Sequence, residues 1–151
     1  IVCIEKIKNK YIKDGIDEFR KRLSKYVNLS VIELAEENDN RSVDYAITRE
    51  TDRIIDTVIK KSKSYNILLD LKGEMKTSEE MALKLEKISL TNSEINFIIG
   101  GSNGVGDKLR QIVDCRLKFS SMTFPHQLMR LILIEQIYRW ITINKNIKYH
   151  K

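Results

Sequence analysis

The sequence FIIGGSNGVGD, residues 97–107, contains the features that decide the fold. A short apolar run leads directly into a cluster of four glycines, which is typical of a buried strand that ends in a tight loop: Gly100, Gly101, Gly104 and Gly106. Glycine at such a strand end lets the backbone approach a ligand closely. The spacing is not G-x-G-x-x-G, and Asp107 stands where a Walker A loop has its lysine. The loop therefore predicts either a ligand site of another type or a turn that simply needs glycine.

Other short apolar runs on both sides of this loop predict a sheet of five strands. The predicted strands are residues 2–7, 31–34, 67–71, 95–99 and 116–119. Segments with helical spacing lie between them, at residues 12–23, 43–59, from a capping box at Thr77, after Gly106, and at 125–142. This alternation predicts an α/β fold with a largely parallel sheet, whose ligand binds at the carboxyl ends of the strands.

Composition narrows the class of protein. A chain of 151 residues that is 42% hydrophobic predicts one domain, residues 1–151, around one sizeable core. The net charge of +6 favours a polyanionic partner, although charge alone is weak evidence. Cys3 and Cys115 form no C-x-x-C pair, so we expect reduced thiols and no metal site. The residues 35–42 read as an exposed polar loop. A charged N-terminus without a long apolar run predicts a cytoplasmic protein with no membrane segment.

Two more strand ends carry polar or backbone-rich loops. The segment FSSMTFPH, residues 119–126, follows the last predicted strand, and ILLDLKG, residues 67–73, contains the third. Carboxyl ends of parallel strands meet at one edge of a sheet, so these loops should lie near Gly100. Met122 and Phe124 could then pack on an adenine ring while main-chain groups bind its edge. The alternatives are a plain helix-entry turn and ordinary buried leucines.

The last predicted helix is apolar around nearly its whole circumference, from Leu128 to Ile141. One face can cover its own sheet, and we expect the other to pack on a second subunit. The alternative is a central helix that its own chain surrounds. Arg130, Glu135 and Arg139 on this helix contact RNA or the facing subunit, or are solvated and ion-paired surface groups. His126 is either a ligand contact or a residue that caps the helix.

Three segments together resemble the RlmH family of SPOUT methyltransferases. They are IGGSNG at residues 99–104, FSSMTFPHQLMRLILIEQIYRW at 119–140 and the closing KYHK at 148–151. The resemblance covers essentially the whole chain, and the TFPHQLMR block is highly specific. One departure is Glu5, which stands where the family usually has glycine.

The resemblance implies a parallel α/β sheet flanked by helices, with a C-terminal deep trefoil knot. It also implies a homodimer whose active site lies at the subunit interface and which binds S-adenosyl-L-methionine in a bent shape. Carried over by position, the residues that bind the cofactor are Leu69, Gly100, Phe119, Ser120, Ser121, Met122, Thr123 and Phe124.

The implied reaction moves a methyl group to N3 of a pseudouridine in 23S rRNA, with the assembled 70S ribosome as substrate and without metal or DNA. From the family pattern, Tyr149 stacks on or hydrogen-bonds to the target base, and His150 makes a polar contact or transfers a proton. Two alternatives remain from the sequence. One is a ribosome-binding module without catalysis, and the other is a SPOUT enzyme for tRNA, against which the lack of an appended RNA-binding domain argues.

Overall fold

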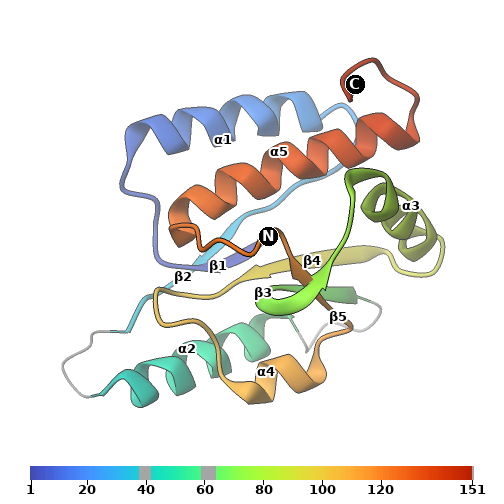
Figure 1. The fold of residues 1–151 in the computed structure, drawn as a ribbon. Helices are drawn as coiled ribbons and strands as arrows, with labels where there is room; N and C mark the ends of the chain where they lie inside the picture. Colours follow the sequence, from blue (N-terminus) through green and yellow to red (C-terminus); the bar gives the residue numbers. More distant parts are fainter. Residues whose placement is uncertain (38–41, 59–63, 151) are drawn as a thin grey trace.

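A computed structural model describes residues 1–37, 42–58 and 64–150, and it contains one five-stranded sheet between two layers of helices (Figure 1). The strands are β1 (Val2–Ile4), β2 (Ile32–Leu34), β3 (Ser64–Met75), β4 (Glu94–Ile99) and β5 (Cys115–Lys118). Their order across the sheet is β2-β1-β4-β3-β5, and every neighbouring pair is parallel. The predicted α/β class and parallel sheet are confirmed.

Five helices connect or follow the strands: α1 (Lys10–Leu23), α2 (Val43–Val58), α3 (Ser78–Ser89), α4 (Asp107–Ile112) and α5 (His126–Asn144). The capping box at the start of α3 is confirmed, because the Thr77 hydroxyl accepts from the Glu80 N–H at 3.2 Å while the Glu80 carboxylate accepts from the Thr77 N–H at 2.8 Å. Ile59, expected in α2, and residues 38–41 of the expected polar loop lie outside the described residues.

Two apolar clusters hold the layers to the sheet. Helices α1, α3 and α5 cover one face, with Ile12, Met81, Leu133 and Trp140 buried against it. Helices α2 and α4 cover the other face through Ile54, Val58 and Leu109. Successive residues of β4 serve opposite clusters, since Phe97 and Ile99 belong to the first and Ile98 to the second. This alternation is the two-residue period of a strand buried on both faces.

Strand β1 is shorter than predicted, because the backbone turns at Glu5. Glu5 has φ of 72°, which is outside the range of a strand and which L-residues with side chains adopt only at a cost. Glycine takes this conformation freely, which agrees with the glycine that the resemblance leads us to expect at this position. The predicted strand 2–7 is therefore wrong beyond Ile4.

Strand β3 is longer than predicted, and it contains an irregularity. Leu69 and Glu74 both pair with Leu117 of β5, so the residues between them bulge out of the ladder at the carboxyl end of the sheet. Gly73 is required there, because a Cβ atom would lie 2.7 Å from the backbone carbonyl of Arg116. Periodicity could not show this bulge, since Leu117, whose pairing defines it, lies 48 residues after Leu69 and 43 after Glu74.

Helix α5 is covered by its own chain to a greater extent than the sequence suggested. It lies between α1 and α3 on the sheet, and both helices pack on it (Figure 1). None of the exposed large apolar side chains in the described part of the chain belongs to α5. The apolar circumference of this helix is therefore explained mostly by burial within the chain, as in the alternative of a central helix.

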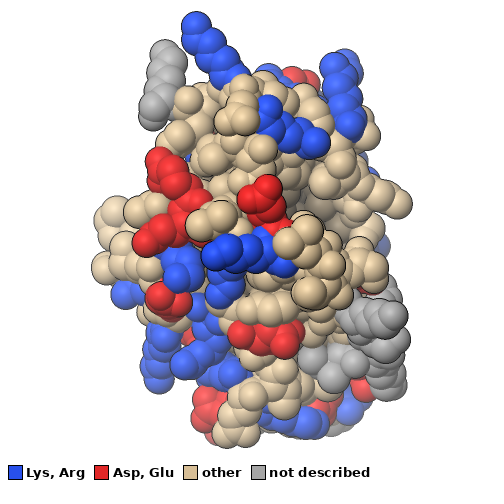
Figure 2. Space-filling view, turned by 90° about the vertical axis from the view of Figure 1, so that its right-hand side faces the viewer, with Lys and Arg blue, Asp and Glu red and all other residues tan. Residues whose placement is uncertain are grey.

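Charge is mixed over the face that looks toward the viewer in Figure 2. Lysine and arginine side chains gather at its upper and lower parts, and acidic side chains lie among them. The net charge of +6 is thus not concentrated into one basic patch in the described part of this face. Among the described helices, none combines the length and the apolar character that a membrane span requires.

Candidate functional site

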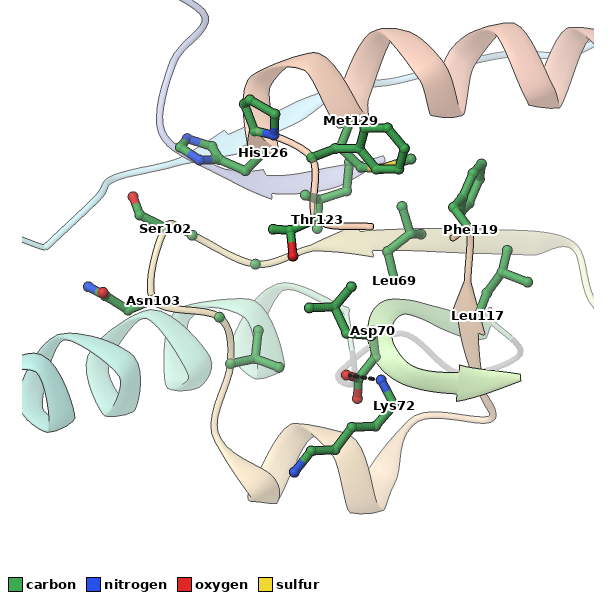
Figure 3. A pocket seen from close by; sticks show the side chains of 18 of the residues that line it. Leu69, Asp70, Lys72, Ser102, Asn103, Leu117, Phe119, Thr123, His126 and Met129 are labelled. Atoms are coloured by element: carbon green, nitrogen blue, oxygen red, sulfur yellow. Dashed lines mark hydrogen bonds between the residues drawn. The ribbon is translucent and has the colours of Figure 1, made fainter. Parts of the chain in front are cut away.

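A cavity of about 730 Å³ lies at the carboxyl edge of the sheet, where three strand ends meet the start of α5 (Figure 3). Its walls come from residues 69–72 after the regular part of β3, residues 99–105 at the end of β4, residues 117–124 around the end of β5, and the first turn of α5. The volume is in the range of pockets for nucleoside-sized ligands. The three loops singled out from the sequence thus meet in one place.

The predicted cofactor residues line this cavity with one exception. Leu69, Gly100, Phe119, Ser120, Met122, Thr123 and Phe124 all contribute to its wall. Ser121 belongs to the same loop but is exposed and does not line the cavity. Apolar side chains and main-chain groups dominate the wall, which suits a flat heterocycle with polar edges.

The glycine loop after β4 is closed by its own backbone. Gly104 has φ of +83° and donates its N–H to the Gly101 carbonyl at 3.0 Å. A Cβ atom on Gly100 would lie 2.7 Å from a methyl group of Val105 and 3.0 Å from the Gly104 carbonyl oxygen. Both proposed reasons for glycine therefore hold here, because the loop is a tight turn and also brings bare backbone to the cavity wall.

A buried ion pair fixes the bulge of β3, and sequence reasoning missed it. The Asp70 carboxylate accepts from the Arg110 guanidinium at 3.1 Å and from the Lys72 N–H at 3.0 Å, and Arg116 lies 3.8 Å away. The Asp70 side chain is only 6% exposed, so the arginine on α4 compensates a charge that would otherwise be costly to bury. The one sign of this ion pair in the sequence is a charged residue, Asp70, inside an apolar strand.

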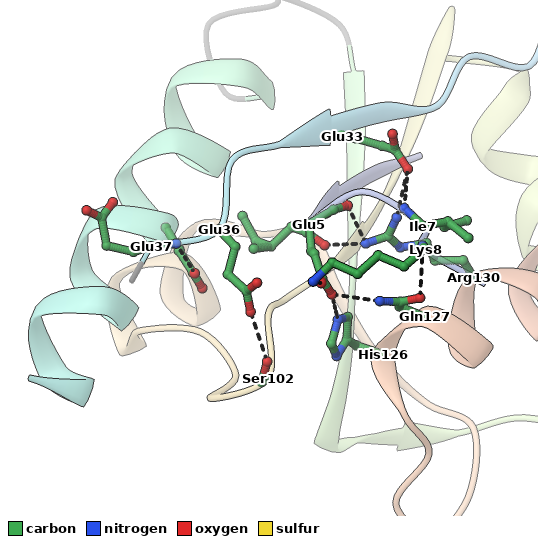
Figure 4. Close-up of polar contacts among 12 residues, drawn as sticks. Glu5, Ile7, Lys8, Glu33, Glu36, Glu37, Ser102, His126, Gln127 and Arg130 are labelled. Carbon is green, nitrogen blue, oxygen red and sulfur yellow. Dashed lines mark hydrogen bonds and ion pairs between the residues drawn. The ribbon is translucent and has the colours of Figure 1, made fainter. Parts of the chain in front are cut away.

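His126 and Arg130 join the first turns of α5 to the end of β1 (Figure 4). His126 Nε2 lies 2.6 Å from a Glu5 carboxylate oxygen, and its ring forms part of the cavity wall. Arg130 is 1% exposed and donates to the Ile4 and Glu5 carbonyls and to Glu33. Of the alternatives for Arg130, a surface position is therefore wrong, while an ion pair is present, with Glu33 at 3.0 Å.

The C-terminal tail lies at the other end of α5. The Tyr149 hydroxyl donates to Glu135 at 2.9 Å, and the Arg139 guanidinium lies 4.9 Å from the centre of the Tyr149 ring. Burial, together with the hydrogen bond to Glu135, raises the pKa of the Tyr149 phenol, which keeps it neutral at physiological pH. Glu135 and Arg139 thus form an ion pair, with 2.6 Å between their charged atoms, and both contact Tyr149 of the tail.

His150 is held by one donor and one acceptor. Arg139 approaches its Nδ1 at 3.3 Å, and a Glu79 carboxylate oxygen lies 2.7 Å from its Nε2. A guanidinium can only donate and a carboxylate can only accept, so the neutral ring carries its hydrogen on Nε2. The lone pair of His150 then lies on Nδ1, where it accepts the hydrogen bond from Arg139.

The structure does not bring Tyr149 and His150 to the cavity of the same chain. His126 at the cavity and Glu135 at the tail are nine positions apart on α5, which is roughly 13 Å along a helix axis. Neither tail residue belongs to the cavity wall. Among the described residues, no cluster of His, Cys, Asp or Glu has a geometry that could hold a metal ion.

Comparison with protein families adds an independent observation. The family described as "Predicted SPOUT methyltransferase" matches residues 1–150 of the chain. The chain belongs to the SPOUT methyltransferase family.

Curated relatives of this SPOUT protein match it along their whole length. A protein of Fusobacterium nucleatum named "Ribosomal RNA large subunit methyltransferase H" is 55% identical, over 100% of this chain and 97% of the relative. Proteins of the same name from Clostridioides difficile and Caldicellulosiruptor saccharolyticus are 48% and 39% identical, each over 100% of this chain and 98% of the relative. The resemblance read from the sequence segments is thereby confirmed at the level of the family.

Proposed function

We propose that this SPOUT protein transfers a methyl group from S-adenosyl-L-methionine to N3 of a pseudouridine in 23S rRNA. The observation that carries the proposal is the cavity at the carboxyl edge of the sheet, formed by the same loops that carry the RlmH resemblance. The names of the full-length relatives, which refer to the RNA of the large ribosomal subunit, support the substrate. The reaction takes place in the cytoplasm, where ribosomes are.

The fit of the cavity supports this cofactor. Gly100 and the loop from Phe119 to Phe124 would hold the adenine ring between apolar side chains and main-chain groups, and Leu69 would pack against it. When bound, the cofactor supplies an electrophilic methyl carbon on a positively charged sulfur. Because no metal has to take part, the protein contributes orientation, exclusion of water and a proton acceptor.

We further propose that residues 119–125 form part of a trefoil knot, as the resemblance implies. These residues return the chain from β5, at the edge of the sheet, to α5, whose Arg130 contacts Ile4 and Glu5 of β1's end. The return therefore passes the ends of β3 and β4, whose loops line the same cavity. Such a crossing is rare in proteins, and unfolding experiments on circularised chains can test it.

The active form is a homodimer in which the tail of one subunit serves the cavity of the other. The separation of tail and cavity along α5 supports this arrangement, because one chain by itself leaves Tyr149 and His150 away from the cofactor. Leu71 and Met122 at the cavity rim are 56% and 70% exposed, so they offer apolar surface to a second subunit. Each active site is then complete only in the dimer.

In this arrangement the tail handles the target base. Tyr149 is a neutral phenol that can stack on the base or donate a hydrogen bond to it. As the N3 lone pair forms a bond to the methyl carbon, the carbon–sulfur bond breaks and the N3 hydrogen leaves as a proton. His150 Nδ1 accepts that proton once the ring has left Arg139.

A methyl-transfer assay tests the proposal. The protein and labelled S-adenosyl-L-methionine are incubated with 70S ribosomes, 50S subunits and protein-free 23S rRNA, all lacking the modification, and the methyl group is mapped. We expect transfer to 70S ribosomes alone, at N3 of one pseudouridine. Cofactor binding without label in any RNA would overturn the catalytic claim and favour a ribosome-binding module, and label in tRNA would indicate a different substrate.

A further inference from the structure

Glu5 combines a strained backbone with a buried, fully engaged side chain. Its φ of 72° is unfavourable for any residue except glycine, yet the residue is only 8% exposed and its carboxylate has three partners. Lys8 lies 2.5 Å from one carboxylate oxygen, and the other oxygen receives His126 at 2.6 Å and Gln127 at 2.9 Å (Figure 4). An unfavourable conformation that is held in place by its surroundings often has a function.

The partners of Glu5 place it directly behind the cofactor loop. His126 and Gln127 are the first residues of α5, and they follow Pro125 and Phe124, which line the cavity. The amide oxygen of Gln127 also accepts from the Lys8 N–H at 3.4 Å, which ties this turn a second time to the segment after β1. The network therefore fixes the end of the loop from Phe119 to Pro125 relative to the rest of the sheet.

Arg130 also joins α5 to the end of β1, but through backbone groups. It binds the backbone carbonyls of Ile4 and Glu5, so its contacts do not depend on the identity of the side chain at position 5. The contacts of Arg130 with the end of β1 therefore persist without the Glu5 side chain, whereas the Glu5 carboxylate contacts only the first turn of α5. This division separates a contribution to folding from a contribution to the shape of the cavity.

We propose that Glu5 is a positioning residue for the cofactor loop, acting through His126 and Gln127, and that this chain tolerates the strained backbone for that purpose. The inference rests on the proposed function of the cavity. It implies that the side chain of Glu5 raises affinity for S-adenosyl-L-methionine while adding little to the stability of the fold.

The test compares the wild type with Glu5→Gly and Glu5→Gln. Calorimetry gives the Kd for S-adenosyl-L-methionine, thermal unfolding gives the Tm, and the methyl-transfer assay gives KM for the cofactor and kcat. Glu18→Gln is the matched control, because it removes the same charge from an exposed pair, with Arg22 at 2.8 Å on α1.

We expect Glu5→Gly to raise Kd and KM about tenfold, the size of effect that loss of hydrogen bonds to a charged group produces. Its Tm should stay within about 3 °C of the wild type, because relief of the strained backbone offsets the lost contacts. The kcat at saturating cofactor should remain within about twofold. Glu5→Gln should lose about threefold in affinity, since its amide oxygen still accepts from Gln127, and Glu18→Gln should lose nothing.

Two results would overturn the positioning role. Unchanged affinity in Glu5→Gly would show that the network does not reach the cofactor, and a parallel fall of Tm and affinity would assign Glu5 to folding. If the wild type itself does not bind S-adenosyl-L-methionine, the proposed function fails and the positioning role fails with it. If the wild type binds it and Glu5→Gly binds it equally well, only the positioning role fails.

Discussion

The cavity at the carboxyl edge of the sheet and the C-terminal tail are held by different kinds of contact. Backbone and glycine shape the cavity, and the sheet fixes them, so that a single methyl group on Gly100 or Gly73 would not fit. Side-chain contacts hold the tail, and one of them, His150 with Glu79, joins partners that are 28% and 61% exposed. Exposed ion pairs contribute little free energy. The cavity is therefore fixed by the fold, whereas the contact of His150 with Glu79 can break at small cost.

The largest expected effect is a fall in kcat when a residue of the tail is changed. His150→Ala removes the proposed proton acceptor, so kcat should fall about 100-fold, in the usual range for a general base. The Kd for S-adenosyl-L-methionine should stay as in the wild type, because His150 does not line the cavity. Single-turnover assays on 70S ribosomes together with calorimetry measure both. Equal losses in kcat and affinity would remove the distinction between the two regions.

The second largest expected effect is a rise in the cofactor Kd when a residue of the cavity wall is changed. Gly100→Ala places a Cβ atom 2.7 Å from Val105 and 3.0 Å from the Gly104 carbonyl, which forces the loop to shift. We expect the cofactor Kd to rise roughly 30-fold, as for an overpacked site. Gly15→Ala on α1 is the control, since its Cβ would meet only the flexible end of the Leu131 side chain on α5, at 2.9 Å, and neither residue lines the cavity. Equal affinities for the two variants would contradict a backbone-shaped cavity.

Mixing the two variants tests whether cavity and tail come from different subunits. After Gly100→Ala and His150→Ala subunits have exchanged, about half of the dimers are mixed, and each mixed dimer has one site without either change. At a cofactor concentration below Kd, activity should recover to about a quarter of the wild type, about 25-fold above His150→Ala and about eightfold above Gly100→Ala alone. The control mixes two preparations of His150→Ala. Absence of recovery, despite exchange seen with tagged subunits, would place both halves in one chain.

The smallest expected effect concerns Glu50, whose carboxylate lies beside the glycine loop: a Cβ atom on Gly101 would be 2.6 Å from it. Glu50 is 4% exposed and accepts from the Glu37 N–H at 2.9 Å, and burial raises the pKa of its carboxyl. The folded state then holds its proton more tightly than the unfolded state, so stability falls as pH rises above about 4.5. Glu50→Gln should remove this loss and raise the free energy of unfolding at pH 7 by about 1 kcal/mol. Urea unfolding at pH 4 and pH 7 measures the difference, and a variant that is destabilised at pH 7 would contradict it.

Local sequence patterns were enough to predict the sheet and the cavity. Strand ends in a parallel sheet meet at one edge, so recognising the runs that end at Leu71, Ile99 and Phe119 already placed their loops together. The same patterns could not give the bulge of β3 or the turn at Glu5. Both depend on partners far along the chain, Leu117 for the first and His126 for the second.

The tail shows a different limit of sequence reasoning. Only resemblance drew attention to Tyr149 and His150, because residues at a chain end carry no periodic signal. The structure adds that Glu135 and Arg139, which were ambiguous on an apolar helix, are the residues that hold the tail. The burial of Arg130 could not be predicted from the sequence either. An arginine at 1% exposure is rare, and its carbonyl partners lie near the other end of the chain.

The contacts of Arg130 also determine the order in which the molecule can be made. Arg130 and Ile4 are 126 positions apart, so during synthesis at roughly 5–20 residues per second the first strand waits about 6–25 s for its partner. His126 and Met129, which complete the cavity, arrive in the same interval. The part of the cavity wall that α5 supplies is thus among the last to form, and a chain interrupted before α5 contains all five strands but lacks His126 and Met129 of that wall.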